Sequence, residues 1–398
     1  MITQKQVKIG VIGVTGRGKL AEHWHKPQGE SVVVAGMDTN EDALIQFKKS
    51  IGSDVFVTQD IKEFFKVKDM DAVVVTSPDW THEEYVMEAF KSGKHVFCEK
   101  PMAITTQGCD KLLNAWQKSG KHFMIGFNMR YMNIFRVMKD IVDSGVLGEI
   151  KIVWVRHFVG RGGDWYYHDW HGNSKNTTSL LLQKASHDID MIHWITGRYT
   201  KKVIASGSLD YYGGKKPNTL RCPNCFEKNN CIEFNYDETD INRVNKMDMC
   251  VFRQEIDVED NSTVMMELEG GIKVTYMQCH WTPDYCRNYT FIGTEGRMEN
   301  LDDSDKVIVK TRDRSKRWKN LADQVYSVKP AVGGHGGADP IICKDFVDMI
   351  LTGKKPISTP LAGRMSVAVA CAATESIRNG NRLIKIPDVS RNFKNKVF

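Results

Sequence analysis

The sequence contains no long apolar run. None of its stretches approaches the ~18 consecutive apolar residues that a membrane-spanning helix needs, and its first residues lack the pattern of a secretory signal peptide. We therefore expect a cytoplasmic protein without a membrane partner.

A strong excess of one charge is also missing. The 55 Lys and Arg residues against 49 Asp and Glu give a formal net charge of +6, which is spread along the chain. A solvated surface explains this balance better than nucleic acid binding, which needs a concentrated basic patch. Internal repeats are absent as well, and 398 residues make two domains the default expectation.

Disulfide bonds are not expected, although the chain has ten cysteines, because the cytosol keeps thiols reduced. A polar, irregular segment of about 205–250 holds Cys222 and Cys225, spaced C-x2-C, and then Cys231 and Cys250. Four sulfurs at such spacing would close a tetrahedral zinc site, structural because no coordination position stays open. The alternative is a set of free cysteines in a strand-rich domain.

A glycine-rich turn follows the first predicted strand. The apolar run Val7–Ile12 leads into Gly13-Val14-Thr15-Gly16-Arg17-Gly18, and a helical pattern begins at Lys19. Strand, turn and helix in this order are the setting in which backbone N–H groups bind a dinucleotide pyrophosphate. The usual fingerprint has glycine in place of Thr15, whose Cβ we expect to crowd the closest approach.

An acid at the end of the second strand suggests which dinucleotide binds. Asp38 follows the strand Ser31–Met37, about twenty residues past the glycine turn, where a carboxylate suits a ribose diol and repels a 2′-phosphate. We therefore prefer NAD over NADP. The alternative role is a helix cap before Asn40, and Asp38 could serve both.

Further strands alternate with helical patterns, which predicts a parallel, doubly wound α/β sheet. Ligands bind beyond the carboxyl ends of such strands. The residues that we expect there, around the cofactor, are Thr76, Ser77, Pro78, His82, Glu99, Lys100 and Asn128. Lys100, beside Glu99 and before Pro101, can act as a positioned proton or hydrogen-bond donor, the alternative being a surface turn.

These motifs together resemble the Gfo/Idh/MocA oxidoreductase family, in order and in spacing. The match rests on the turn at 13–18, Asp38, Thr76-Ser77-Pro78 with His82, Glu99-Lys100-Pro101, and Gly126 to Tyr131. The resemblance implies a nucleotide domain at residues 1–128, and a substrate and oligomerisation domain at 129–398 with a large, mostly antiparallel sheet. It also implies a homodimer or homotetramer, and an active-site Lys100 whose bond to Pro101 is cis.

An aromatic segment, Gly160–Gly172, departs from both core and linker composition, because it mixes rings with charges and glycines. Flat rings beside hydrogen-bonding groups suit a sugar, and a packed structural loop is the alternative. The substrate candidates in this segment are Trp165, Tyr167, His168, Asp169, Trp170 and His171. Two others are Arg130, which belongs to the 126–131 motif, and His335, which lies among glycines that either place it over the pocket or only shape a loop.

A helix is predicted to end at Gly197, with Gln183, Lys184 and His187 on one face. Histidine titrates near neutrality, which suits a base that takes a hydroxyl proton. In many members of the family that this chain resembles, an Asp precedes that histidine by four residues; the position is Gln183 here, which cannot accept a proton. Lys184 would replace the acid by a charge contact, or bind a substrate hydroxyl.

These features lead to an NAD-dependent enzyme that oxidises a ring hydroxyl of a sugar, glycoside or polyol. His187 would remove the hydroxyl proton, Lys100 would hydrogen-bond the oxygen, and the carbinol hydride would pass to the nicotinamide. The resemblance favours formation of a 3-keto glycoside. The alternatives are a glycosidase that works by transient oxidation, elimination, hydration and re-reduction, and a sugar sensor without catalysis.

Overall fold

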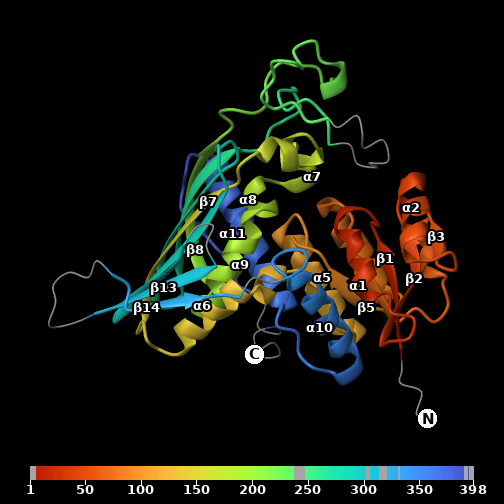
Figure 1. The fold of residues 1–398 in the computed structure, drawn as a ribbon, viewed down its shortest axis with the longest axis horizontal. Helices are drawn as coiled ribbons and strands as arrows, with labels where there is room; N and C mark the ends of the chain where they lie inside the picture. Colours follow the sequence, from red (N-terminus) through yellow and green to blue (C-terminus); the bar gives the residue numbers. More distant parts are fainter. Residues whose placement is uncertain are drawn as a thin grey trace. The chain divides into compact units, whose positions relative to one another are not determined.

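Two β-sheets organise the part of the chain that the structure describes, one in each of two units (Figure 1). The structure, a computed structural model, describes residues 6–236, 247–301, 305–312, 321–329, 332–389 and 393. Unit 1 is formed mainly by residues 6–132 and 332–367, and unit 2 lies within residues 133–329 and 368–388. Part of the predicted insertion, residues 237–246, lies outside the described residues.

Unit 1 contains a six-stranded sheet in the order β3-β2-β1-β4-β5-β6, with every pair parallel. Its strands are β1 (Val7–Ile12), β2 (Ser31–Met37), β3 (Phe56–Thr58), β4 (Ala72–Val75), β5 (His95–Cys98) and β6 (Phe123–Ile125). The strand order reverses between β1 and β4, and in open α/β sheets ligands bind beyond the carboxyl ends of the strands at such a switch point. This confirms the predicted doubly wound sheet.

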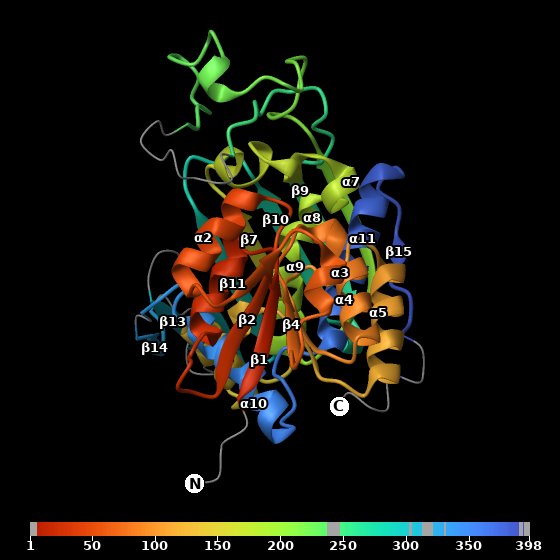
Figure 2. The same ribbon diagram turned by 90° about the vertical axis from the view of Figure 1, so that its right-hand side faces the viewer.

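Helices lie on both sides of this sheet, with α3, α4 and α5 together on one side in Figure 2 and α2 on the other. The helices of unit 1 are α1 (Ala21–Trp24), α2 (Glu41–Ile51), α3 (Ile61–Phe65), α4 (His82–Lys91), α5 (Thr106–Ser119), α10 (Ala338–Thr352) and the first part of α11 (Pro360–Arg378). The predicted second domain, residues 129–398, includes α10, but α10 packs in unit 1.

Three aromatic rings explain how α10 docks. Phe346 of α10 lies edge-on to Trp24 and to Phe97, with ring centroids 6.1 and 5.6 Å apart, and Trp24 meets Phe97 at 5.4 Å. All three side chains are fully buried, and the Trp24 indole N–H donates to the Cys343 carbonyl at 2.9 Å. Edge-to-face rings add to the apolar burial that holds this segment in unit 1.

Unit 2 contains a nine-stranded sheet in the order β14-β13-β12-β11-β7-β10-β9-β8-β15, antiparallel except for the β7–β10 pair. Its strands are β7 (Ile150–Phe158), β8 (Thr200–Ser208), β9 (Asn261–Leu268), β10 (Lys273–Cys279), β11 (Cys286–Gly293), β12 (Gly296–Asn300), β13 (Lys306–Thr311), β14 (Gln324–Ser327) and β15 (Ile384–Lys385). A turn at Gly270-Gly271 joins β9 to β10, and both glycines have positive φ.

Helices cover one face of the second sheet (Figure 1). They are α6 (Asn133–Asp143), α7 (Ser174–Thr177), α8 (Leu180–Gln183), α9 (Ala185–Thr196) and the end of α11. Strand alternation points Val153, Val155 and His157 of β7 toward this covered face. Ile152 and Trp154 point to the opposite face, where each is 47% exposed.

Two features differ from the prediction. The helix expected from Lys19 is a 3-10 turn (Gly16–Leu20) followed by the single turn of α1, so the glycine-rich loop does not open a long helix. The helix expected through Gln183 is interrupted at Lys184, between α8 and α9, although it ends at Gly197 in a left-handed cap as predicted. In the described residues, no helix is long and apolar enough to cross a membrane.

We predict that Phe346→Ala lowers the free energy of unfolding by about 3–5 kcal/mol, because it empties the ring cluster that docks α10. Phe56→Ala is the matched control, since Phe56 is 43% exposed, and should cost less than about 1 kcal/mol. Denaturant midpoints measure both. Equal losses for the two variants would contradict this account of docking.

Candidate active site

The glycine-rich turn after β1 has two glycines that packing requires and one that faces open space. A Cβ on Gly13 would lie 2.5 Å from the Ser77 nitrogen, and one on Gly18 would lie 2.2 Å from the Gly13 oxygen. Gly16, with φ of +50°, would place a Cβ where no atom lies within 4 Å. Thr15 has an ordinary φ of −93°, so its position does not need glycine's conformational freedom.

Asp38 holds the turn from the neighbouring strand. One carboxylate oxygen accepts the backbone N–H of Val14 at 3.0 Å, and the other accepts that of Asn40 at 3.0 Å. The cap of α2 is Asn40 itself, whose side chain accepts the N–H of Ala43. Because a carboxylate has about four acceptor sites, each Asp38 oxygen keeps capacity for a ribose hydroxyl.

Thr76 and His82 connect the loops at the carboxyl ends of the strands. The Thr76 hydroxyl donates to the Gly13 carbonyl at 2.7 Å, and Ser77 shares a 2.6 Å hydrogen bond with Thr81. The buried His82 ring contacts the Ser77 carbonyl at 2.8 Å and the Pro101 carbonyl at 2.7 Å. His82 therefore shapes the loops, and both of its ring nitrogens are used in doing so.

Arg17 of the turn is held by two carboxylates. Its Nε donates to Glu99 at 2.8 Å, and its Nη1 donates to Asp339 at 3.0 and 3.1 Å. The His335 Nδ1 lies 2.9 Å from Asp339 and 3.0 Å from Arg17 Nη1. Burial tends to raise the Asp339 pKa, but hydrogen bonds from His335 and Arg17 hold it well below its usual range. His335 thus belongs to unit 1, in a loop that braces the turn.

Lys100 follows β5 and its bond to Pro101 is cis, as the resemblance implied. The Glu99 carboxylate, which we expected to hold the lysine side chain, accepts from Arg17 and from the backbone N–H of Lys100 at 3.2 Å. Gly126 makes room for this carboxylate, because a Cβ there would lie 2.8 Å from it. Glu99 therefore positions Lys100 through the backbone.

Asn128 and Arg130 lie in the 3-10 turn after β6 (Asn128–Tyr131) and both are buried. The Asn128 side-chain oxygen is buried without a partner among the described residues. Arg130 donates to the Ile357 carbonyl at 2.5 Å within unit 1. This contact favours a structural role for Arg130 over the predicted substrate contact.

In unit 2, Lys184 occupies the break between α8 and α9, and its ammonium lies 5.6 Å from the centre of the Tyr166 ring. Burial, followed by the nearby charge of Arg287, lowers the Lys184 pKa to about 8. The buried His187 and Gln183 lie on either side of it in the sequence. A lysine that loses its proton near neutral pH is a candidate for acid–base work or for hydroxyl binding.

The residue after His187 is the centre of a buried polar network that the sequence analysis missed. Asp188 accepts from His157 Nδ1 at 3.0 Å, from Arg287 Nε at 2.8 Å and from Tyr276 at 3.1 Å, and also from the Tyr289 hydroxyl. Its side chain is fully buried. The network fixes the first turn of α9, which carries His187, against strands β7, β10 and β11.

The charges of this network are set by its burial. Burial alone would raise the Asp188 pKa, but the Arg287 charge and the bonds from His157 and Arg287 hold it well below its usual range. Burial and Arg287 lower the His157 pKa to about 3, so its imidazole is neutral. The Arg287 Nη2 atom is buried without a hydrogen-bond partner in the part of the chain described.

The aromatic segment divides into buried and accessible residues. Tyr167 is fully buried, stacked on Tyr212 with ring centroids 4.0 Å apart. The buried His168 contacts the carbonyls of Met249 at 2.6 Å and Glu233 at 2.7 Å. Packing therefore explains these two residues better than substrate contact does. Of the substrate candidates in this segment, those that keep accessible surface are Trp165, Asp169, Trp170 and His171.

The zinc prediction is not confirmed. All four cysteines are free thiols, and as the side chains stand no group of three Cys, His, Asp or Glu residues in the described ranges could hold a metal ion. The four cysteines nevertheless line one small cavity.

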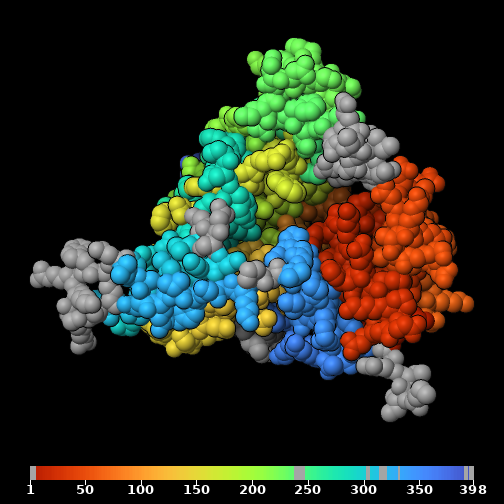
Figure 3. Space-filling view, in the orientation of Figure 1, coloured from red at the N-terminus to blue at the C-terminus, as the bar shows by residue number. Residues whose placement is uncertain are grey.

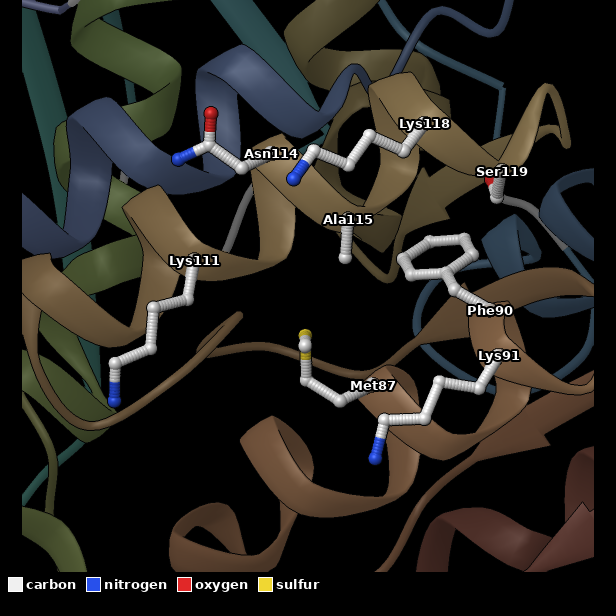
Figure 4. A pocket seen from close by; sticks show the side chains of 8 residues that line it. All are labelled: Met87, Phe90, Lys91, Lys111, Asn114, Ala115, Lys118 and Ser119. Atoms are coloured by element: carbon white, nitrogen blue, oxygen red, sulfur yellow. The ribbon is translucent and has the colours of Figure 1, made fainter.

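A groove of about 470 Å³ lies between α4 and α5 (Figure 4). Met87, Phe90 and Ala115 form its apolar floor, and Lys91, Lys111 and Lys118 lie around it. It is lined by the later turns of both helices, whereas the candidate cofactor residues of unit 1 lie at the carboxyl ends of its strands. Its chemistry is that of a surface groove, not of a catalytic site.

Two family models match the chain. Residues 7–127 match an oxidoreductase family with an NAD-binding Rossmann fold, and residues 139–386 match the C-terminal alpha/beta domain of the same family. The chain belongs to the Gfo/Idh/MocA oxidoreductase family. The resemblance seen in the sequence is thereby confirmed, together with the NAD-binding fold of the first half.

Relatives with curated names share parts of the chain. YteT of Bacillus subtilis (strain 168) is 26% identical over 347 residues, which cover 79% of this chain and 80% of YteT. The inositol 2-dehydrogenase of Serratia proteamaculans (strain 568) is 33% identical over 192 residues, or 48% of this chain. The match spans about half (54%) of that dehydrogenase's length.

Solved structures share the whole fold. A levoglucosan dehydrogenase in complex with NADH and levoglucosan is 18% identical, with a TM-score of 0.76 over 96% of this chain and 100% of that one. The scyllo-inositol dehydrogenase of Lactobacillus casei with bound NAD(H) and scyllo-inositol is 20% identical, with a TM-score of 0.71 over 96% and 99%. At these identities the likeness establishes the fold alone.

We predict that Asp188→Asn lowers the free energy of unfolding by about 3–5 kcal/mol at pH 7, because it leaves Arg287 charged and unpaired in the interior. The Asp188 pKa is lower folded than unfolded, so its stabilisation is complete above about pH 4 and is lost as the pH falls. The gap between wild type and variant should therefore narrow toward pH 3 in denaturant titrations. The exposed Asp284→Asn is the control, and a gap independent of pH would refute the charge argument.

Proposed function

We propose that this family member is an NAD-dependent dehydrogenase that oxidises a ring hydroxyl of a sugar or polyol. The observation that carries the proposal is Lys100, which follows β5 in the NAD-binding unit and precedes a cis peptide bond to Pro101. Unit 2 separately contains the buried Lys184, whose pKa is lowered to about 8, and the buried His187. The relatives named for inositol and levoglucosan support the substrate class.

The glycine-rich turn fits a dinucleotide. The side of Gly16 that a Cβ would occupy is open, and the bonds from Thr76 and Asp38 hold the turn in shape. Asp38 would bind the ribose diol and disfavour a 2′-phosphate, which supports NAD over NADP. NAD supplies the hydride acceptor when it is bound.

The remaining steps belong to the protein's own side chains. His187 removes the proton of the reacting hydroxyl, while Lys100 donates a hydrogen bond to the same oxygen. Lys184, as an ammonium, binds a neighbouring hydroxyl. Asp188 is a positioning residue, because it acts through the turn that carries His187. Gln183 accepts hydrogen bonds but no proton, so no carboxylate tunes the base from that position.

The favoured product of this oxidation is a 3-keto glycoside. A ketone acidifies the adjacent C–H bond, so the same oxidation could begin an elimination. The accessible Asp169 and His171 would serve that glycosidase route. The sensor alternative is less favoured, because Lys100 and His187 are both present.

We also propose that the chain self-associates through the second sheet. The face of that sheet away from its helices exposes Ile152, Trp154 and Met265, at 47%, 47% and 55%. Apolar side chains gathered on one sheet face are typical of a subunit interface. A homodimer or homotetramer would bury them.

The test of function is NADH absorbance after NAD is mixed with the protein and a panel of sugars, polyols and glycosides. We predict that Lys100→Ala lowers kcat by about 10²-fold or more, and that Lys91→Ala, an exposed lysine of α4, leaves kcat unchanged. Release of an aglycone without net NADH would instead establish the glycosidase, and NAD binding without turnover the sensor.

A second prediction concerns pH. If the Lys184 ammonium binds a substrate hydroxyl, the substrate KM should rise as the pH increases through about 8, where this lysine loses its proton. Lys184→Met should raise KM at pH 7 and abolish the rise in KM with pH, and Lys184→Arg should keep KM low to higher pH. KM profiles from pH 6 to pH 10 measure this. The same rise in KM in Lys184→Met would exclude hydroxyl binding by the Lys184 ammonium.

A further inference from the structure

The four cysteines of the insertion, Cys222, Cys225, Cys231 and Cys250, come together in space. Their side chains line one cavity of about 20 Å³. A cavity of roughly 10–15 Å³ already holds one water-sized sphere, so this cavity has room for a single ion. In Figure 3 the insertion, coloured green, projects from unit 2.

The backbone around the cysteines has the form of a thiolate knuckle. The Cys225 N–H donates to the Cys222 carbonyl at 3.2 Å, which closes a tight turn through Pro223. The Cys222 N–H donates to the Asp248 carbonyl at 2.8 Å, and the Cys250 N–H donates to the Leu220 carbonyl at 2.9 Å. These two bonds hold the segment of Cys250 beside the turn that carries Cys222.

Apolar packing does not account for the order of this segment. The apolar cluster nearest to it contains Tyr212, Val251 and Ile256 but no residue of 222–236. Phe226 and Ile232 are 87% and 88% exposed. A connection this long, without regular structure, needs another device to hold it, and a metal cross-link is one.

We propose that Cys222, Cys225, Cys231 and Cys250 bind one Zn²⁺ ion as a structural site. All four residues line the same cavity, and their side chains would have to turn toward its centre to become ligands. Each thiol releases its proton to solvent as it becomes a ligand, and the resulting site carries a charge of 2−. Lys228 lines the same cavity, so one cation stands close by to offset part of that charge.

The ion would also stabilise the aromatic segment. His168 contacts the Glu233 and Met249 carbonyls, and its Nδ1 lies 3.8 Å from the Cys222 sulfur. Zinc would therefore fix the loop that carries Trp165, Trp170 and His171 by fixing the backbone on which His168 is hydrogen-bonded.

The test is metal analysis of the full-length protein, expressed in zinc-supplemented medium and dialysed without chelator. We expect about one zinc per chain, and a zinc content at background in the double variant Cys222→Ser with Cys225→Ser. Cys371→Ser, in α11, is the matched control and should keep its zinc. A double variant that keeps as much zinc as the control would mean an adventitious ion and overturn the proposal.

Wild-type protein provides a second measurement that does not depend on a variant's folding. Among the cysteines that keep accessible surface, Cys225 and Cys231 should resist a thiol reagent until a chelator is added, whereas Cys279 and Cys371 should react at once. Cobalt in place of zinc should give the absorption of tetrahedral thiolate coordination. Background zinc with all exposed thiols reactive, or a disulfide found by mass spectrometry between two of the four, would refute the site. Neither result bears on NAD turnover.

Discussion

A single buried carboxylate is the constraint on which the second unit depends. Asp188 is charged in a fully buried position, which is tolerated only because Arg287, His157 and two tyrosine hydroxyls bond to it at once. These partners come from β7, β10 and β11. The Asp188 side chain therefore fixes the first turn of α9 to three strands. The same turn carries His187, the residue before Asp188.

Unit 1 solves a similar problem by different means. Its loops are held mainly by backbone groups: Asp38 accepts from two amides, Thr76 donates to a carbonyl, and His82 contacts two more. Such contacts leave the turn's open side to a ligand with phosphates and hydroxyls. The second unit buries the charges of Asp188 and Arg287, and burial together with the Arg287 charge lowers the pKa of the neighbouring Lys184.

The sequence predicted what depends on local order and missed what depends on distant pairing. Strands, the glycine turn and the Glu99-Lys100-Pro101 motif were found because each is a short pattern read along the chain. The contact between Arg17 and Asp339 joins residues 322 positions apart, and that between Asp188 and Arg287 joins residues 99 positions apart. Tyr167 and His168 are buried, which composition could not indicate, because it does not tell which side of a loop a ring faces.

Glutamine at position 183, next to Lys184 in the sequence, bears on the charge of that lysine. A carboxylate in its place would favour the charged ammonium and raise the Lys184 pKa. With glutamine there, the main charge acting on Lys184 is that of Arg287, and burial and repulsion together lower its pKa to about 8. A neutral residue at position 183 is therefore compatible with a lysine that titrates near pH 8, three residues before His187 in the sequence.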